Sequence, residues 1–199
     1  MIAIEDVVLV LLAAGLSRRF GGSKLDADLH GMPLGLHAAT ALAEIPFRAR
    51  VAVTGRSRID YAAHGFHVVT NDDPARGQSR SVALGVAAAR TLGAAAVLVA
   101  LADMPRVTAD HVRALADAAD GPDAVVASRD GDAAKPPALF GRGRFDALLA
   151  LTDDRGARDL IRSGRLVAAP PGALVDVDTT ADLTAMRDAL ERQSQPDGA

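Results

Sequence analysis

The sequence predicts a three-layer α/β fold around a mostly parallel β-sheet, and two observations lead to this prediction. Short apolar runs typical of buried strands alternate with segments of helical periodicity along nearly the whole chain. With 199 residues, 49% of them apolar and 24% charged, the chain is long enough to bury a substantial core. We therefore expect a single domain over residues 1–192 and a disordered tail over residues 193–199.

The first half of the chain predicts three strands and two helices. A β-branched and leucine-rich run at residues 7–13 is bounded by a glycine-rich loop, which favours a buried parallel strand. Pro33 suits the first turn of a helix, which is expected to continue to residue 44 and to end before Pro46. The other elements expected here are strands at residues 50–55 and 67–71 and a helix at residues 79–92.

The second half begins with the most apolar strand-like run, residues 94–105, which ends in Asp103 followed by Met-Pro. Thr108 is expected to cap a helix that continues to residue 119. Ligands bind at the carboxyl ends of the strands in such sheets, so Asp103 and the glycine-rich loop should lie at one ligand-binding edge. The remaining expected elements are strands at residues 123–128, 165–170 and 173–178 and helices at residues 145–151, 156–163 and 180–193.

Composition and charge exclude several classes of function. The formal net charge is −3 and aromatic residues make up 3% of the chain, without Trp, which argues against nucleic acids and anionic membranes as partners. The absence of Cys excludes disulfides, thiolate catalysis and Cys-based zinc sites. The apolar run near the start is too short to span a bilayer and follows no basic segment, so a cytoplasmic location is expected.

The segment "LLAAGLSRRFGGSKL", residues 11–25, crowds glycines and basic residues directly after the first predicted strand. It matches neither the dinucleotide-binding pattern G-x-G-x-x-G nor the phosphate-loop pattern G-x-x-x-x-G-K-[ST]. Backbone N–H groups in such a turn can still hold an anion, and small side chains let a flat ring or a phosphate chain approach the backbone. Lys24 is one of only two lysines in the chain, and its compact ammonium suits phosphate.

This segment resembles the signature of the molybdopterin nucleotidyltransferases, L-A-[AG]-G-x-S-x-R-[MF]-G-x-x-K, through its small triplet and Ser17, Arg19, Gly21 and Lys24. The resemblance continues in "NDDPARGQSRSVALGV", "ALADMPRVT", "LTDDRGARDLI" and "VDVDTTADL". The chain departs from the family at "AAKPPALF", where a G-x-P strand is common. The resemblance thus covers most of the chain and implies a Rossmann-like sheet of the nucleotide-diphospho-sugar transferase type.

The same resemblance implies an Mg²⁺-dependent nucleotidyltransferase. Its expected reaction is transfer of CMP from CTP to the phosphate of molybdopterin or the molybdenum cofactor, with release of pyrophosphate. CTP is favoured because an Ala-Ala-Gly triplet accompanies cytidine enzymes in this family, whereas Ala-Gly-Gly accompanies guanosine enzymes. The expected partners are the nucleotide, the phosphorylated acceptor, and a molybdoenzyme or a chaperone.

The matched motifs also imply the site residues. Lys24, Asp103 and Arg19 are expected to be catalytic, with Lys24 on the β- and γ-phosphates and Asp103 on Mg²⁺. Asp178 is the second expected metal ligand, and Asp176 stays an alternative because the two would share a face of a strand. The residues expected to contact the nucleotide are Ala13, Ala14, Gly15, Ser17, Gly21, Lys24, Asn71, Asp72, Ser79 and Ser81.

Several alternatives stay open. Lys135, Asp154 and Arg158 are expected to contact the acceptor, although Asp154 and Arg158 would equally suit the start of a helix. Asn71 and Asp72 would equally form a polar turn. The competing functions are guanylyl transfer, transfer to another phosphorylated small molecule, and non-catalytic nucleotide binding by an accessory protein of a molybdoenzyme. A nicotinamide oxidoreductase is disfavoured because the dinucleotide-binding pattern is absent.

Overall fold

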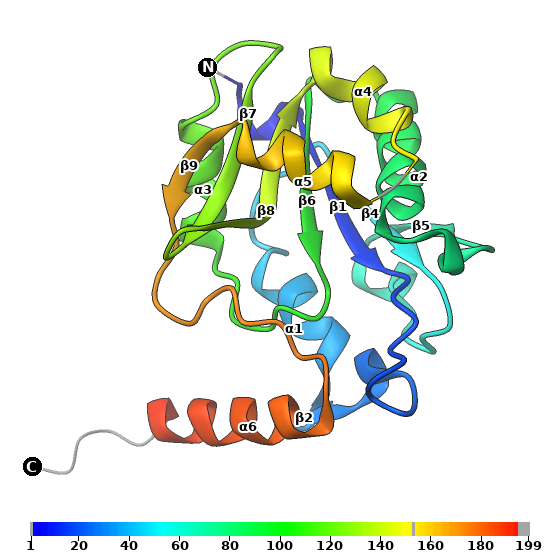
Figure 1. The fold of residues 1–199 in the computed structure, drawn as a ribbon, viewed down its shortest axis with the longest axis vertical. Coiled ribbons are helices and arrows are strands. Elements are labelled where there is room, and N and C mark those ends of the chain that lie inside the picture. The colour runs from blue at the N-terminus through cyan, green and yellow to red at the C-terminus, as the bar shows by residue number, and fades with distance from the viewer. Residues whose placement is uncertain (1, 153, 195–199) are drawn as a thin grey trace, which may run out of the picture.

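The structure, a computed structural model, describes residues 2–152 and 154–194, except for the side chains of residues 154–156, 193 and 194. Its centre is a seven-stranded sheet in the order β5-β4-β1-β6-β8-β7-β9 (Figure 1). The strands of this sheet are β1 (Val7–Ala13), β4 (Ala49–Thr54), β5 (His67–Thr70), β6 (Ala96–Leu101), β7 (Val125–Asp130), β8 (Ala133–Gly141) and β9 (Arg165–Ala168). A small antiparallel pair, β2 (Asp28–Leu29) and β3 (Met32–Pro33), lies outside it.

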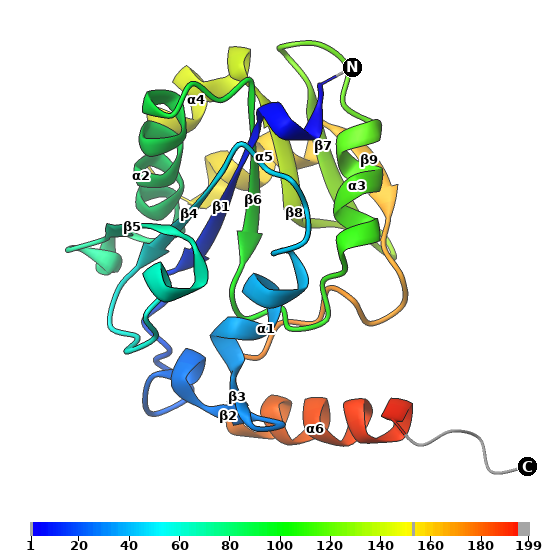
Figure 2. The same cartoon turned by 180° about the vertical axis from the view of Figure 1, so that it is seen from behind.

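Helices cover both faces of the sheet, so the predicted three-layer arrangement is confirmed (Figures 1 and 2). The helices α2, α4 and α5 lie on one face, and α1 and α3 lie on the other. The helices are α1 (Leu34–Ala41), α2 (Gln78–Thr91), α3 (Ala109–Asp117), α4 (Phe145–Leu149), α5 (Asp154–Arg162) and α6 (Thr180–Ser194). In the described part of the chain, no helix has the length and apolar character that crossing a membrane requires.

The two cores meet at β1, all seven residues of which are buried. Successive side chains of a strand point to opposite faces, so the strand supplies both cores at once. Leu9 and Leu11 pack in the cluster that contains α1 and α3 residues, whereas Val8 and Val10 pack in the cluster that contains α2, α4 and α5 residues. A strand buried on both sides reads as a continuous apolar run, which is the pattern that predicted it.

The sheet is mostly but not wholly parallel. Strand β1 pairs in parallel with β4 and β6, β4 with β5, and β7 with β9, whereas β8 runs antiparallel to both β6 and β7. The sequence analysis did not predict β8. Its adjacent prolines, Pro136 and Pro137, lack N–H donors and argue against a central strand. The strand accommodates them where the register with β7 shifts between Ala127 and Ser128.

The strand predicted at residues 173–178 is wrong, because this segment has no strand neighbour in the structure. Its Leu174 and Val177 are buried but lie three positions apart, and Val175 between them is 42% exposed, so burial does not follow the period of two that a half-buried strand requires. The backbone N–H of Val177 instead donates a hydrogen bond to the Asp103 carbonyl oxygen, 3.0 Å away. The segment therefore crosses the carboxyl end of β6 as an irregular strap.

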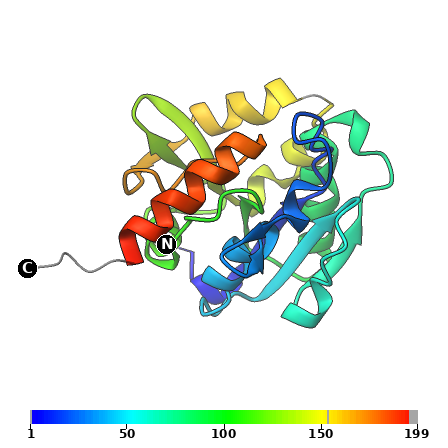
Figure 3. The same cartoon turned by 90° about the horizontal axis from the view of Figure 1, so that it is seen from below.

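Helix α6 lies beyond the carboxyl ends of β1 and β6, across the end of the molecule at which the expected site lies (Figures 1 and 3). It is held by a third apolar cluster, in which Leu183 and Met186 of α6 pack with Leu29, Leu34 and Val177. This packing fixes the segment that enters α6. The helix predicted at residues 33–44 is shorter than expected, since α1 ends at Ala41. The predicted N-cap of α3 is confirmed, because Thr108 Oγ1 accepts a hydrogen bond from the His111 N–H.

Candidate active site

A cavity of about 450 Å³ opens at the carboxyl ends of β1 and β6. Its lining comes from the loop after β1, the start of α2, the end of β6, α5 and the segment before α6. The predicted site residues that line it are Ala14, Gly15, Arg19, Lys24, Ser81, Asp103, Arg158 and Asp176. The fold thus brings together residues from five segments that are far apart in the sequence, at the edge where α/β sheets bind ligands.

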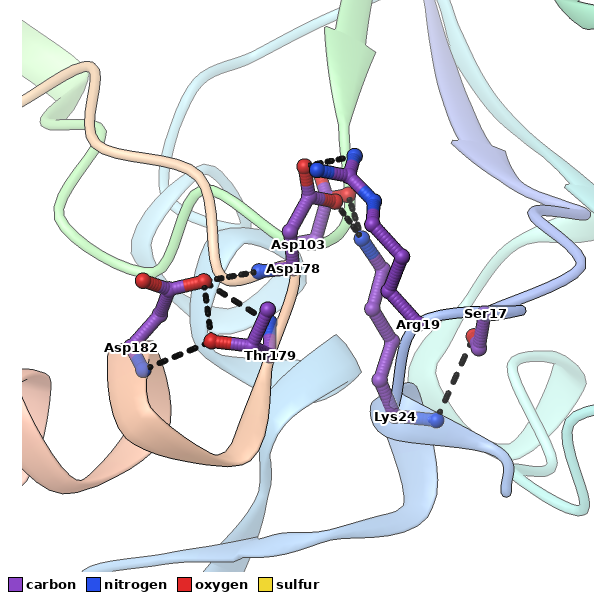
Figure 4. Close-up of polar contacts among 7 residues, drawn as sticks. All are labelled: Ser17, Arg19, Lys24, Asp103, Asp178, Thr179 and Asp182. Atoms are coloured by element: carbon purple, nitrogen blue, oxygen red, sulfur yellow. Dashed lines mark hydrogen bonds and ion pairs between the residues drawn. The ribbon is translucent and has the colours of Figure 1, made fainter. Parts of the chain in front are cut away.

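Lys24 lies between two carboxylates at this cavity (Figure 4). Its Nζ atom is 2.6 Å from Asp103 Oδ2 and 2.8 Å from Asp178 Oδ1. The Lys24 side chain is only 8% exposed, so solvent screens these two interactions little. Arg19, whose side chain is 72% exposed, donates to the other Asp178 oxygen at 2.5 Å.

Backbone contacts nearby position Lys24 and Asp178. Ser17 adopts a left-handed conformation with φ of 49°, and its hydroxyl accepts a 3.3 Å hydrogen bond from the Lys24 N–H. Asp182 Oδ2 accepts from the N–H groups of Asp178 and Thr179 at the start of α6. Ser17, predicted to contact nucleotide, therefore shapes the loop that presents Lys24.

The electrostatics of the three groups follow from burial and pairing. Burial raises the pKa of Asp103 above its usual value, although Lys24 opposes the rise. Burial alone would lower the pKa of Lys24, but Asp103 and Asp178 outweigh it and the pKa is raised. The hydrogen bond from Lys24 lowers the pKa of Asp178. Lys24 is thus held as a cation by two acidic neighbours.

Asp103 carries one further anomaly. Its Oδ1 atom is buried and has no hydrogen-bond partner among the described residues. Such an atom is costly unless something binds it, because a buried polar group without a partner loses its hydration. The atom belongs to a residue that lines the cavity.

The start of α2 forms another wall of the cavity through Gly77, Gln78 and Ser81. Gly77, the residue before the helix, has φ of 89°, and the N-terminal end of α2, where the helix dipole is positive, lies at this cavity. Gly77 belongs to a motif that the family resemblance covers, whereas Gln78 was not among the expected site residues. The signal was present in the loop "GQSRS", which precedes a strongly periodic helix.

Two glycines explain how the walls come so close. A Cβ at Gly85 would lie 2.2 Å from Val10 Cγ1, so α2 packs directly against β1. A Cβ at Gly55 would lie 3.1 Å from the Ala14 Cα, so the end of β4 lies against the Ala13–Gly15 backbone. Gly55 was not identified from the sequence, since nothing local distinguishes it from any glycine that ends a strand.

Asn71, Asp72 and Ser79 are not part of the cavity lining. Asn71 is buried, donates to Ser81 Oγ at 2.9 Å, and accepts from Arg80 Nε at 3.1 Å. Its Oδ1 also accepts from the Asp73 N–H, as in a polar turn. Asp72 is exposed, and the hydrogen bond from Arg80 lowers its pKa. This network holds the turn before α2.

The residues predicted to contact the acceptor separate in the structure. Arg158 of α5 lines the cavity. Lys135 of β8 does not line it and pairs with Asp130, 3.1 Å away. The side chain of Asp154 lies outside the described residues. Arg158 is therefore the predicted acceptor residue that lies beside Lys24 and Asp103.

Asp176 and Asp178 do not share the face of a strand, since the segment is irregular. Asp178 contacts Lys24 and Arg19, whereas Asp176 lines the cavity and raises the pKa of Asp103 through its negative charge. Both carboxylates thus act on the same site by different routes. In the described part of the chain, no group of three or more His, Asp or Glu residues has the arrangement of a complete metal site.

Comparison with known proteins gives consistent matches. A family model described as a MobA-like NTP transferase domain matches residues 9–169. The purine catabolism protein PucB of Bacillus subtilis is 32% identical over 198 residues, which cover 91% of this chain and 96% of PucB.

Solved structures show the same fold. The homologue of Mycobacterium tuberculosis Rv0371c from Mycobacterium sp. strain JC1 has a TM-score of 0.82 and 27% identity, covering 96% of this chain and all of that one. The molybdopterin-guanine dinucleotide biosynthesis protein A of Archaeoglobus fulgidus has a TM-score of 0.66 and 18% identity, covering 93% and 99%. At that identity the second similarity concerns the fold.

Proposed function

Because the chain belongs to the MobA-like NTP transferase domain family and is therefore a nucleotidyltransferase, we propose that it transfers CMP from CTP to the phosphate of molybdopterin or the molybdenum cofactor. In this reaction an acceptor oxygen attacks the α-phosphorus, the bond to the bridging oxygen breaks, and pyrophosphate leaves. The protein supplies no covalent nucleophile. It has to align the two substrates and balance the charge of the triphosphate.

One observation carries the proposal: the buried pair of Lys24 and Asp103 at the carboxyl end of β6, with Asp103 Oδ1 unpartnered among the described residues. Lys24 would bind the β- and γ-phosphates as a point charge, with Arg19 as a second cation. The start of α2 lines the same cavity, and the backbone N–H groups of a helix N-terminus would add to the binding of phosphate.

Mg²⁺ fits the residues present. Carboxylate oxygens are the donors that this ion prefers, and the buried Asp103 Oδ1 atom has no hydrogen-bond partner among the described residues. Asp103 and Asp178 would hold the ion. When bound, Mg²⁺ neutralises phosphate oxygens at the reacting centre. The backbone hydrogen bonds described above would hold Lys24 and Asp178 in position, through Ser17 for Lys24 and through Thr179 and Asp182 for Asp178.

The preference for CTP rests on the Ala13-Ala14-Gly15 triplet. Ala14 is 5% exposed and Gly15 is exposed at the cavity, so backbone groups rather than long side chains would meet the base. GTP is the alternative nucleotide, since the solved molybdopterin-guanine dinucleotide protein has the same fold. We further propose that Gly21, whose φ of 79° shapes the loop, and Ala13 act on the nucleotide through this backbone.

The acceptor would meet Arg158, whose guanidinium suits a phosphate. Lys135 and Asp154 stay predicted contacts of the acceptor. The single domain over residues 1–192 and the cytoplasmic location also stay predictions. A different phosphorylated small molecule is the second candidate acceptor, favoured by the similarity to PucB, a purine catabolism protein. A non-catalytic accessory role beside a molybdoenzyme is disfavoured, because a protein that only binds nucleotide needs no metal carboxylate.

The test has two steps. Thermal-shift titration with the four nucleoside triphosphates, with and without Mg²⁺, should give the largest stabilisation with CTP plus Mg²⁺. Release of pyrophosphate after addition of molybdenum cofactor should then follow. A larger response to GTP would replace the proposed nucleotide. Binding of CTP without release of pyrophosphate when molybdenum cofactor is added would exclude the proposed acceptor. Asp103→Asn is the inactive variant, and Asp110→Asn, at an exposed carboxylate on α3, is its matched control.

A further inference from the structure

The Lys24 ammonium lies in the position of a cation shared by two carboxylates. It contacts Asp103 Oδ2 at 2.6 Å and Asp178 Oδ1 at 2.8 Å, and Arg19 contacts the second Asp178 oxygen at 2.5 Å. Three of the four carboxylate oxygens are therefore already engaged by cations from the protein itself. The fourth, Asp103 Oδ1, is buried without a partner among the described residues.

The charges in this group balance before any ligand enters. Lys24 and Arg19 supply two positive charges, and Asp103 and Asp178 supply two negative charges. A divalent ion that entered alone would meet an ammonium and a guanidinium at the same oxygens. Like charges repel at such distances, most strongly at the buried Lys24. The phosphates of a nucleotide would remove this repulsion, because they offer Lys24 and Arg19 an alternative anionic partner.

We propose that Lys24 is a place-holder cation that occupies the carboxylate pair until the phosphates of the nucleotide draw it away, so that metal and nucleotide bind cooperatively. This inference rests on the proposed function, because it assumes that Asp103 and Asp178 hold the metal. By linkage, a metal that needs the nucleotide in order to bind tightly must tighten the binding of the nucleotide by the same factor.

The local structure allows the exchange. Lys24 is fixed at its backbone, where its N–H donates to Ser17 Oγ, but its side chain is a flexible stem of four carbons. Lys24 lines the same cavity as Gly77 and Gln78 at the start of α2, so a phosphate bound in this cavity would offer its ammonium another anionic partner. Only the end of the side chain has to move.

The first experiment measures the dissociation constant of Mn²⁺ alone, from the signal of free Mn²⁺ in electron paramagnetic resonance, without nucleotide. Lys24→Gln removes the place-holder and should bind Mn²⁺ at least about tenfold more tightly than the unchanged protein. Arg19→Gln should show a smaller gain, because Arg19 contacts Asp178 and is largely exposed. Arg113→Gln, at an exposed cation of α3, is the control and should leave the constant unchanged.

A second experiment needs no variant, since the chain has only two lysines. Acetylation of amines followed by mass spectrometry reports Lys24 and Lys135 separately. Mn²⁺ at saturating concentration should displace the Lys24 ammonium and raise its acetylation rate several-fold, whereas Lys135, paired with Asp130, should keep its rate. This measurement stays decisive if Lys24→Gln fails to fold.

The proposal is overturned if Lys24→Gln binds Mn²⁺ no more tightly than the unchanged protein, or if saturating Mn²⁺ leaves Lys24 acetylation unaltered. These failures would not touch pyrophosphate release, so they can be told apart from failure of the proposed function. Conversely, tighter Mn²⁺ binding by Lys24→Gln without transfer to any tested acceptor would support the place-holder and count against the proposed function.

Discussion

Gly85 in α2 gives the sharpest prediction from packing. A Cβ there would lie 2.2 Å from Val10 Cγ1 and 3.2 Å from Val53 Cγ2, and both valines are fully buried in central strands. The first distance is far below van der Waals contact, so Gly85→Ala should cost about 3 kcal/mol, the upper end for overpacking a core. Alanine regains about 1 kcal/mol of helix propensity. The net loss should be about 2 kcal/mol.

Urea unfolding followed by circular dichroism measures this loss as a lower midpoint at an unchanged slope. For a chain of this length, the melting temperature should fall by roughly 4–8 °C. Ala87→Gly, at an exposed position of the same helix, is the matched control and should cost about 1 kcal/mol through propensity alone. Because α2 carries Gly77 and Gln78 at the cavity, Gly85→Ala should also weaken nucleotide binding.

A double variant tests the stated cause. Val10→Ala vacates the space that the new methyl group needs, so the two substitutions together should be more stable than the sum of the single effects by about 1 kcal/mol or more. If Gly85→Ala proved about 1 kcal/mol more stable than the unchanged protein, with no coupling to Val10, helix propensity would dominate. The close approach of α2 to β1 would then be the wrong explanation for this glycine.

Three further predictions follow. Asp103→Asn should abolish turnover in a pyrophosphate-release assay, and retained turnover would refute a metal role. The same variant should lose only roughly 1–2 kcal/mol of unfolding free energy, since Lys24 keeps its ion pair with Asp178. Thr108→Ala removes the cap of α3 and should cost about 1 kcal/mol in urea unfolding, and an unchanged midpoint would contradict the cap. Burial lowers the pKa of His111, so the unfolded state binds its proton first and stability should fall as pH drops below about 6.5. His111→Gln should flatten that fall in urea midpoints measured between pH 7.5 and 5, and an equally steep fall would exclude His111 as its source.

Much of the site was predictable because its parts are local. The run 7–13 is apolar at every position, which only a strand buried on both faces requires, and the glycine-rich loop and Lys24 follow it directly. Asp103 follows the other central strand, β6. Since adjacent parallel strands end at one edge of the sheet, the meeting of Lys24 and Asp103 follows from the order of elements.

Other features depend on distant neighbours and could not be predicted locally. The segment 173–178 resembles a strand, but a strand forms only where another strand offers a ladder of hydrogen bonds. Here Val177 packs with α6 residues instead, and Leu174 packs in the cluster that contains α1 and α3 residues. Conversely, β8 forms despite Pro136 and Pro137, because β6 and β7 flank it on both sides.

The sequence by itself determined the α/β class, both central strands, the glycine-rich loop after the first strand and the family resemblance, since these rest on periodicity and on contiguous motifs. Only the tertiary structure decided that Arg158 reaches the cavity while Lys135 does not, and that Asp178 rather than Asp176 contacts Lys24. The reason is physical: side-chain spacing along one element is fixed by its backbone geometry, whereas contact between elements depends on how their apolar faces pack.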